Sequence, residues 1–329
     1  AGGSDPSYLS NIAFINIASA GGAQNFGDLT TARNHAPAVG SSTRAIWGGG
    51  QINDSGSATN TIDFITLAST GNAADFGDRS VSVRILSAGS NDVRGLFGGG
   101  LTATDTIDHI SIASLGNAID FGNLSASRWY MSAGDTPTRI FWIGGAGASP
   151  GQYQNTIEFS TISTLGNAAD YGDLATAQIN HSTGSSNTRC VNSGGSGDAQ
   201  GTFVAPQYFE AGSTGSGLDF GDLNLDRGSR SGSTSNNVRM INVAGAERAS
   251  PSANHSDVME YVTIATKGDF ADFGNLTEGR RYGIGCSGQG HGGLVEGEPR
   301  GLPLGSGKGF FGGGYQPAET SNIKQVHIT

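Results

Sequence analysis

Six pairs of acidic or amide side chains are the residues of this chain best suited to chemistry. Each pair flanks an aromatic residue and a glycine, and the copies are Asn25-Phe26-Gly27-Asp28, Asp75-Phe76-Gly77-Asp78, Asp120-Phe121-Gly122-Asn123, Asp170-Tyr171-Gly172-Asp173, Asp219-Phe220-Gly221-Asp222 and Asp272-Phe273-Gly274-Asn275. Calcium accepts such oxygens, but it takes about six to eight of them and one copy offers two residues. Asp and Asn also accept hydrogen bonds from backbone N–H groups in turns. We expect the pairs to shape turns and the aromatic residue to pack between repeats, with calcium binding as the alternative.

Arginines at the start of successive repeats could form an anion site around a central channel. They are Arg33, Arg84, Arg128, Arg227 and Arg280, and the fourth repeat has Gln178 in their place. A symmetric ligand site would tolerate this glutamine less well than a packing role would. We therefore predict that each arginine makes a salt bridge or hydrogen bond between repeats, to a backbone carbonyl or to an aspartate of the motif.

The sequence patterns for metal binding and for phosphate binding are weaker than those above. The histidines lack the close pairs of a zinc or copper site, and they fall at unrelated repeat positions: His35, His109, His181, His255, His291 and His327. The glycine runs, such as Gly48-Gly49-Gly50, lack the lysine and helix start of a phosphate-binding loop. We expect them to supply positive φ angles and close backbone approach at strand ends. The sequence predicts neither a metal nor another cofactor.

Irregular loops are the predicted binding surface. The segment 286–309 interrupts the first hairpin of the last repeat, and loops 51–60, 147–155 and 247–257 should share one face of the fold. Long loops on a rigid scaffold are common sites of recognition. The predicted binding residues are Gln51, Asn53, Gln152, Tyr153, His255, Gln289, His291, Glu296 and Arg300. The alternative is that these are solvated loops of a structural protein.

A repeat of four short strands must position these residues. In the first complete repeat, residues 34–39 and 44–47 are predicted to form a hairpin that runs into the triple glycine. Residues 61–69 are rich in β-branched and aromatic side chains and form the predicted third strand. The motif follows on a short outer strand or a tight corner. Third strands that are apolar on both faces suit a position between neighbouring sheets.

The composition restricts the classes of partner that the protein can bind and the compartments in which it can act. The formal charge of −10 and the pI of about 4.9 argue against nucleic acid and anionic membranes, because phosphate binding uses clustered Lys and Arg. No apolar run is long enough to span a bilayer, and the first residues do not resemble a signal peptide. Cys190 and Cys286 lie in different repeats, and we expect two buried free thiols. All 329 residues are predicted to form one domain.

The repeat layout resembles the kelch repeat, which forms β-propeller blades. The shared features are a first strand after an arginine, a second strand ending in a double glycine, a third strand and an aromatic corner. The usual kelch tryptophan of the last strand is Phe or Tyr here. A period of about 40 to 50 residues is itself typical of propellers and solenoids. Phrases such as the one at residues 68–78, Ala-Ser-Thr-Gly-Asn-Ala-Ala-Asp-Phe-Gly-Asp, also resemble repeats in virion structural proteins of marine bacteriophages.

The number of blades depends on the two ends of the chain. Six predicted first strands follow the five arginines and Gln178, which indicates six four-stranded blades. Residues 11–17 and 322–328 are both copies of the third strand, so this strand occurs seven times and seven blades are the alternative. In both cases the last blade must combine strands from the two ends, which removes the open sheet edge. A start in mid-repeat favours loss of an upstream segment by processing or truncation.

The predicted function is that of a non-catalytic propeller module of a phage virion, in a tail, fibre or capsid appendage. Its expected partners are other virion proteins, host-surface glycan and further copies of the chain, with no nucleic acid and no membrane insertion. One alternative is a secreted or cell-surface carbohydrate-binding propeller. Sugar-active enzymes with propellers, of the galactose oxidase or sialidase type, are a further alternative, but their catalytic residues cannot be placed on this sequence.

Overall fold

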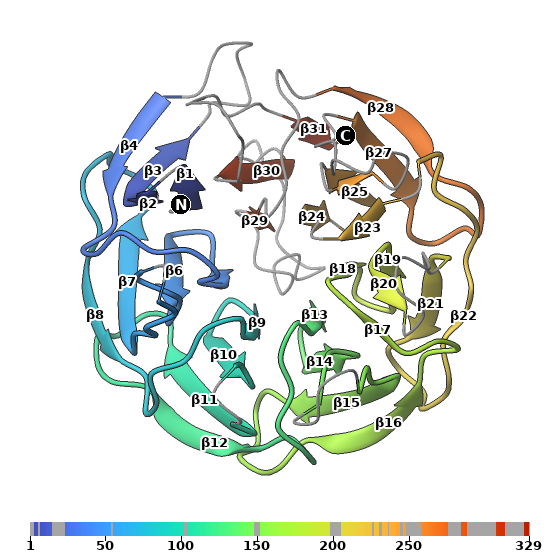
Figure 1. Ribbon diagram of the computed structural model, residues 1–329, viewed down its shortest axis with the longest axis horizontal. Helices are drawn as coiled ribbons and strands as arrows, with labels where there is room; N and C mark the ends of the chain where they lie inside the picture. The colour runs from blue at the N-terminus through green and yellow to red at the C-terminus, as the bar shows by residue number, and fades with distance from the viewer. Residues whose placement is uncertain are drawn as a thin grey trace, which may run out of the picture.

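The protein is an all-β β-propeller. The computed structural model describes residues 3–5, 7–14, 24–53, 55–101, 104–147, 152–197, 205–225, 227–229, 232–235, 237–243, 246–247, 258–275, 284–287, 307–312 and 326–328. Every regular element in these ranges is a β-strand. Small antiparallel sheets stand around a central axis, with their first strands innermost and their last strands on the periphery (Figure 1).

Five of the sheets are four-stranded blades in which chain order runs from the axis outward. Blade one is β5 (Ala38–Gly40), β6 (Arg44–Gly48), β7 (Thr61–Thr66) and β8 (Ala74–Asp78), and blade two is β9 (Ser87–Ser90), β10 (Arg94–Gly98), β11 (Thr106–Ser111) and β12 (Ile119–Asn123). Blade three is β13 (Ser132–Asp135), β14 (Arg139–Ile143), β15 (Thr156–Thr161) and β16 (Ala169–Asp173). Blade four is β18 (Ser182–Ser185), β19 (Arg189–Ser193), β21 (Gln207–Glu210) and β22 (Leu218–Asp219), and blade five is β24 (Gly232–Ser235), β25 (Arg239–Val243), β27 (Val258–Thr263) and β28 (Ala271–Asn275). The predicted four-stranded repeat is confirmed.

The first strands are shorter than predicted. In blade one the strand begins at Ala38, and Asn34 instead makes an isolated bridge to Gln51. Between them His35 has a φ of 52°, a left-handed conformation that interrupts a strand. Small additional pairs occupy this position in blades four and five: β17 (Gln178–Ile179) with β20 (Ser196–Gly197), and β23 (Arg227–Ser229) with β26 (Ala246–Glu247).

The motif lies on the outer strand and forms a β-bulge there. In blade one Ile62 pairs with Gly77 and the next residue, Asp63, pairs with Asp75, so Phe76 has no partner on the third strand. The same register shift occurs in blades two, three and five. A bulge bends its strand and redirects a side chain. Here it belongs to a strand whose aromatic residue is turned into the core.

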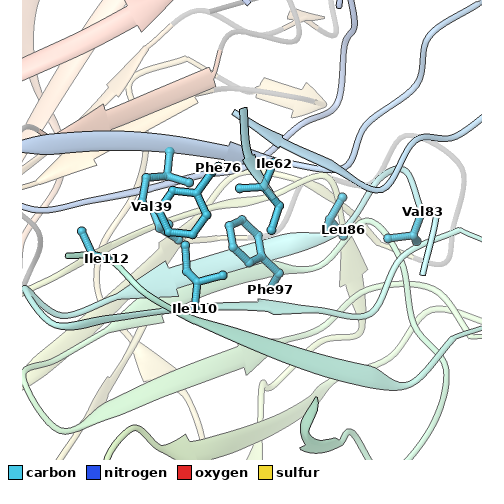
Figure 2. Packing of buried hydrophobic residues seen from close by; sticks show 9 residues of the cluster. Val39, Ile62, Phe76, Val83, Leu86, Phe97, Ile110 and Ile112 are labelled. Atoms are coloured by element: carbon cyan, nitrogen blue, oxygen red, sulfur yellow. The ribbon is translucent and has the colours of Figure 1, made fainter. Parts of the chain in front are cut away.

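The hydrophobic core lies between blades. One cluster combines Val39, Ile62 and Phe76 of blade one with Phe97 and Ile110 of blade two, and Figure 2 shows these side chains in contact range of one another. Each of the five is at most 3% exposed. Burial of such a side chain contributes about 1.5–3 kcal/mol. The motif aromatic therefore packs between repeats, as predicted.

Segments from both ends of the chain meet in the remaining sector. A three-stranded sheet contains β29 (Ile284–Ser287), β30 (Gly307–Gly312) and β31 (Val326–Ile328). The N-terminal part contributes β3 (Asn11–Phe14) paired with β4 (Gln24–Asp28), and the hairpin β1 (Gly3–Asp5) and β2 (Ser7–Leu9). Strand β29 contacts β24 of blade five and β5 of blade one, and β3 contacts β30.

Candidate functional site

The motif acids and amides sit where consecutive blades are joined at the rim. The Gly116 N–H donates to the Phe76 carbonyl at 2.9 Å, and the Ala118 N–H donates to the Asp78 carbonyl at 2.8 Å. In return, the Asp78 N–H donates to Oδ1 of Asn117 at 3.0 Å. We call this three-bond contact between an outer strand and the next Gly-Asn or Gly-Asp turn the outer clasp. It recurs between β4 and blade one, between blades two and three, and between blades four and five.

Two of the motif carboxylates make the local bonds that the turn hypothesis predicts. Oδ1 of Asp75 accepts a hydrogen bond from the Gly77 N–H at 3.2 Å, and Asp272 accepts one from Gly274 at the same distance. Within the described ranges, no group of three or more His, Cys, Asp or Glu side chains is arranged to hold a metal ion. Asp75 and Asp272 thus bond the backbone of their own motif, whereas Oδ1 of Asp28 accepts the Ser10 hydroxyl and Asp219 lies 3.7 Å from Nζ of Lys267.

The glycine of the motif is required by the outer clasp. Gly77 has a φ of +141°, and a Cβ added there would lie 2.5 Å from the carbonyl oxygen of Gly116. Four of the other five motif glycines would place a Cβ 2.2–2.4 Å from the corresponding oxygen of the next blade: Gly27, Gly122, Gly172 and Gly221. Only glycine allows the two backbones to approach so closely. The recurrence of this residue thus reflects blade packing.

Buried ion pairs hold the start of blades one, two and three to the third strand of the same blade. Arg33 pairs with Asp63 at 3.0 Å and Arg79 with Asp108 at 3.1 Å, and all four side chains are fully buried. Burial lowers the pKa of Arg33 and Arg79, and the neighbouring carboxylate opposes this shift. The acid lies on the third strand of the same blade, so the predicted motif-aspartate partner and the predicted bond between repeats are wrong. The predicted bond to a backbone carbonyl is present, from Nη2 of Arg33 to Trp47 at 3.4 Å.

In blade two the buried arginine is not the predicted Arg84. Val83 occupies the place of Arg33, and the buried arginine is Arg79, four positions earlier. Arg84 reaches instead to the preceding blade, where its Nη1 donates to Oε1 of Gln51 at 2.6 Å. Its guanidinium group thus supports a loop.

The glutamine of blade four is matched by a second glutamine. In blade three Arg128 pairs with Glu158, whose Oε1 accepts the Ser125 N–H at 2.8 Å. In blade four the acid position holds Gln207, whose Oε1 accepts the Ala175 N–H at 2.7 Å. Gln178 and Gln207 thus replace both charges together and keep the backbone hydrogen bond. A joint exchange leaves no buried charge unpaired.

A second series of arginines was not predicted. The Nη1 of Arg44 donates to the Ile112 carbonyl of the next blade at 2.6 Å, and its guanidinium lies 5.0 Å from the centre of the Phe64 ring. Arg94, Arg139 and Arg189 make the corresponding bond to the next blade. The signal in the sequence was an arginine at the start of every second strand from blade one to blade five.

The innermost strands are joined by side chains. The Ser90 N–H donates to Oδ2 of Asp135 at 3.0 Å, the Asp135 N–H to Oγ of Ser185 at 3.1 Å, and the Ser185 N–H to Oγ of Ser235 at 2.9 Å. The Gly40 N–H likewise donates to Oγ of Ser90. We call this series the inner belt. It satisfies N–H groups on strands that would otherwise be open sheet edges.

The triple glycines behave as predicted. Gly49 and Gly50 have φ values of +71° and +111°. The Gly50 N–H donates to the Val83 carbonyl at 2.9 Å, which links the end of a second strand to the connection into the next blade.

Four of the predicted binding residues lie in the described ranges. Gln51 is bonded to Arg84 and, through its Nε2, to the Asn53 carbonyl at 2.9 Å. Oδ1 of Asn53 accepts bonds from the Ser55 hydroxyl and the Ser57 N–H. These two side chains build their loop, whereas Gln152 is exposed and Tyr153 is half-buried on another blade. The remaining residues lie outside the described ranges: His255, Gln289, His291, Glu296 and Arg300.

Blade three has an aromatic pair that the sequence did not single out. Trp129 bridges to Ala146, and Ala146 bridges to Tyr153 on its other side. Residues directly opposite one another in antiparallel strands share a face of the sheet. The two aromatic side chains therefore flank the small Ala146 on one face, and both are half-buried.

The described histidines belong to different blades. His181 is 6% exposed, its Nε2 lies 3.1 Å from the Ile143 carbonyl, and burial lowers its pKa to about 4. His109 lies on β11 of blade two, and His35 precedes blade one. Cys190 is a buried free thiol, as predicted, and burial raises its pKa. The side chain of Cys286 lies outside the described part of the chain.

Comparisons with known proteins add no family to this picture. No helix in the described ranges is long and apolar enough to cross a membrane. No protein-family model matches the chain, and no curated protein matches it. The observations on which a function can be argued are therefore the propeller fold and the arrangement of its residues.

Proposed function

We propose that the ring has six kelch-like blades and that the sixth combines β29 and β30 with β3 and β4. The pairing of β3 with β4 repeats that of β7 with β8, because Ile12 faces Gly27 as Ile62 faces Gly77. The contact of β3 with β30 joins the two ends of the chain. Strand β31 is hydrogen-bonded to β30, whereas β3 contacts β30 without pairing with it, so the two copies of the third strand compete for this place in the proposed blade.

Charge favours β3 as the third strand of the closing blade. The buried acid of the other blades is replaced by Ala13 in β3 and by Lys324 in the C-terminal copy, while Arg280 keeps the arginine position. A lysine at the acid position would bring a like charge to the arginine position, which is destabilising, whereas an alanine adds no charge. Trp47 faces Asp63 in blade one, and the corresponding residues of the proposed closing blade are Phe311 and Ala13. The variant Phe311→Cys/Ala13→Cys should therefore form a disulfide. Faster crosslinking of Phe311→Cys with Lys324→Cys would assign the position to β31.

We propose that the chain is a non-catalytic structural module of a phage virion, in a tail, fibre or capsid appendage that also contacts the host surface. The observation that supports this role is the use of the recurring polar groups. The outer clasp and the inner belt bind blade to blade, and the buried ion pairs hold the entry of a blade to its own third strand. Such a ring suits a rigid building block. The resemblance of the repeated sequence segments to repeats of phage virion proteins is the reason for proposing a virion as its location.

Fractionation of purified phage particles tests this proposal. We expect the chain to co-purify with particles at a fixed copy number, and to lie in an appendage when labelled particles are imaged. Its absence from particles would contradict the virion proposal. Recovery as a free protein that binds cells would favour the second candidate, a secreted or surface carbohydrate-binding propeller. The aromatic pair of blade three is the observation that favours this candidate. Release of sugar by the purified chain would contradict the non-catalytic assignment.

A further inference from the structure

The aromatic pair of blade three has a well-defined spacing. Trp129 and Ala146 exchange both backbone hydrogen bonds, at 3.1 and 2.7 Å. Ala146 and Tyr153 face each other between two other bonds, Gly147 N–H to the Gln152 carbonyl and Gln154 N–H to the Gly145 carbonyl, each 2.8 Å. Trp129 and Ala146 are a hydrogen-bonded pair, with Cα atoms about 5.5 Å apart, and Ala146 and Tyr153 are a non-hydrogen-bonded pair, with Cα atoms about 4.5 Å apart. The Cα atoms of Trp129 and Tyr153 are therefore about 10 Å apart. A single methyl group stands between the rings.

The blade fold does not require aromatic residues at these two positions. Blade one has the same bridges in the same order, through Asn34, Gln51 and Ala58, so an amide and a methyl group suffice there. The aromatic residues that the fold does use are buried, as Phe121 and Tyr171 are at 2% exposure. Trp129 and Tyr153 remain partly accessible to solvent. Their position therefore suits a ligand.

The surroundings favour a neutral, hydroxyl-rich ligand. Residues 147–155 contain no charged residue and include the amides of Gln152, Gln154 and Asn155. Arg128, next to Trp129 in the chain, is buried and paired with Glu158. Residues 147–155 and the paired Arg128 thus offer an anionic ligand no free cation. Aromatic faces attract the C–H edges of a sugar ring, and amides bond its hydroxyl groups.

We propose that Trp129 and Tyr153 form a stacking platform for two consecutive pyranose rings of a neutral glycan, with Gln152 as a hydrogen-bonding partner. The spacing of the pair suits adjacent rings of one chain, and Ala146 leaves room for the linkage between them. This inference rests on the proposed contact with the host surface and assigns its ligand class. It places the contact on blade three.

Tryptophan fluorescence reports directly on this site. The other two tryptophans, Trp47 and Trp142, are 4% and 0% exposed, so acrylamide should quench mainly Trp129. We expect cellotetraose, mannotetraose or chitotetraose to protect Trp129 from quenching in a saturable way. If none of the three protects it at millimolar concentration, the proposal is overturned.

Variants taken from blade one keep the test independent of folding. Trp129→Asn and Tyr153→Ala reproduce the residues of blade one, and each should weaken binding by about three- to tenfold in calorimetry. Leu165→Asn, at an exposed turn, is the control and should bind as the parent does. Unchanged binding by the double variant Trp129→Asn/Tyr153→Ala would overturn the platform. Neither result alters whether the chain is found in particles, so the two proposals can fail separately.

Discussion

The outer clasp predicts a graded response to alanine at three glycines. Gly77 combines a φ of +141° with a Cβ position 2.5 Å from the Gly116 carbonyl oxygen. Gly116 has a φ of +150° but open space around its Cβ position, and Gly71 has open space and no positive φ. Gly77→Ala therefore introduces both a steric clash and backbone strain, Gly116→Ala introduces backbone strain alone, and Gly71→Ala introduces neither.

We expect Gly77→Ala to be the most destabilising of the three. Backbone strain costs about 1–3 kcal/mol, and each of the three hydrogen bonds of the clasp that is lost costs about 1 kcal/mol more. With all three bonds lost the sum is about 4–6 kcal/mol for Gly77→Ala, against about 1–3 kcal/mol for Gly116→Ala, which keeps the clasp. Gly71→Ala should leave stability unchanged or raise it by up to about 1 kcal/mol.

Urea denaturation followed by circular dichroism measures this order, and hydrogen exchange locates its cause. The amides of Gly116 and Ala118, which donate to blade one, should exchange faster in Gly77→Ala and at the parent rate in Gly71→Ala. Equal midpoints for Gly77→Ala and Gly116→Ala would show that backbone strain alone explains the glycine. A neutral Gly77→Ala would refute the clasp as a source of stability.

Four further predictions address charge, pH, thiol reactivity and metal dependence. Arg128→Gln should cost about 3–5 kcal/mol in urea denaturation because it leaves Glu158 buried without its partner, and the double change Arg128→Gln/Glu158→Gln should recover most of this loss, as blade four indicates. Burial lowers the pKa of His181 from 6.5 to about 4, so the unfolded chain binds more protons than the folded chain between these two pH values. The contribution of His181 to the free energy of unfolding is therefore complete above pH 6.5 and falls by about 3 kcal/mol as the pH drops to about 4. His181→Met introduces the residue that blade three has at the corresponding position, Met131, and should remove this part of the pH dependence; an unchanged profile would assign it to other groups. Cys190 should react with a thiol reagent only after unfolding, so rapid labelling of this residue in the native protein would contradict its burial. Chelation with EDTA should leave the Tm unchanged, whereas a lowered Tm that calcium restores would revive the motif as a cation site.

The repeat pattern was sufficient to predict the blades. Alternation of short apolar segments with glycine-rich turns indicated four strands, and the structure confirms them in five blades. The burial of Phe76 and the positive φ of Gly49 and Gly50 were also predicted. These features are local, because strand length, turn chemistry and backbone sterics depend on neighbouring residues.

The partners of the arginines could be predicted only in part. A salt bridge was expected, but the choice of Asp63 over a motif aspartate depends on which side chains the bulge brings together. Two compensating changes in the sequence could have indicated the answer. One is the exchange of Val83 and Arg79 in blade two, and the other is the joint appearance of Gln178 and Gln207.

The sequence by itself determined the period, the strand order and the positions that must be aromatic or glycine, since these follow from backbone geometry within one repeat. Only the tertiary structure decided which residues from different repeats touch. The inner belt joins Ser90 to Asp135, 45 residues apart, and the bridges of blade three place Ala146 between Trp129 and Tyr153. Such contacts depend on how blades stack and how loops fold back, and the spacing of residues along one strand carries no information about them.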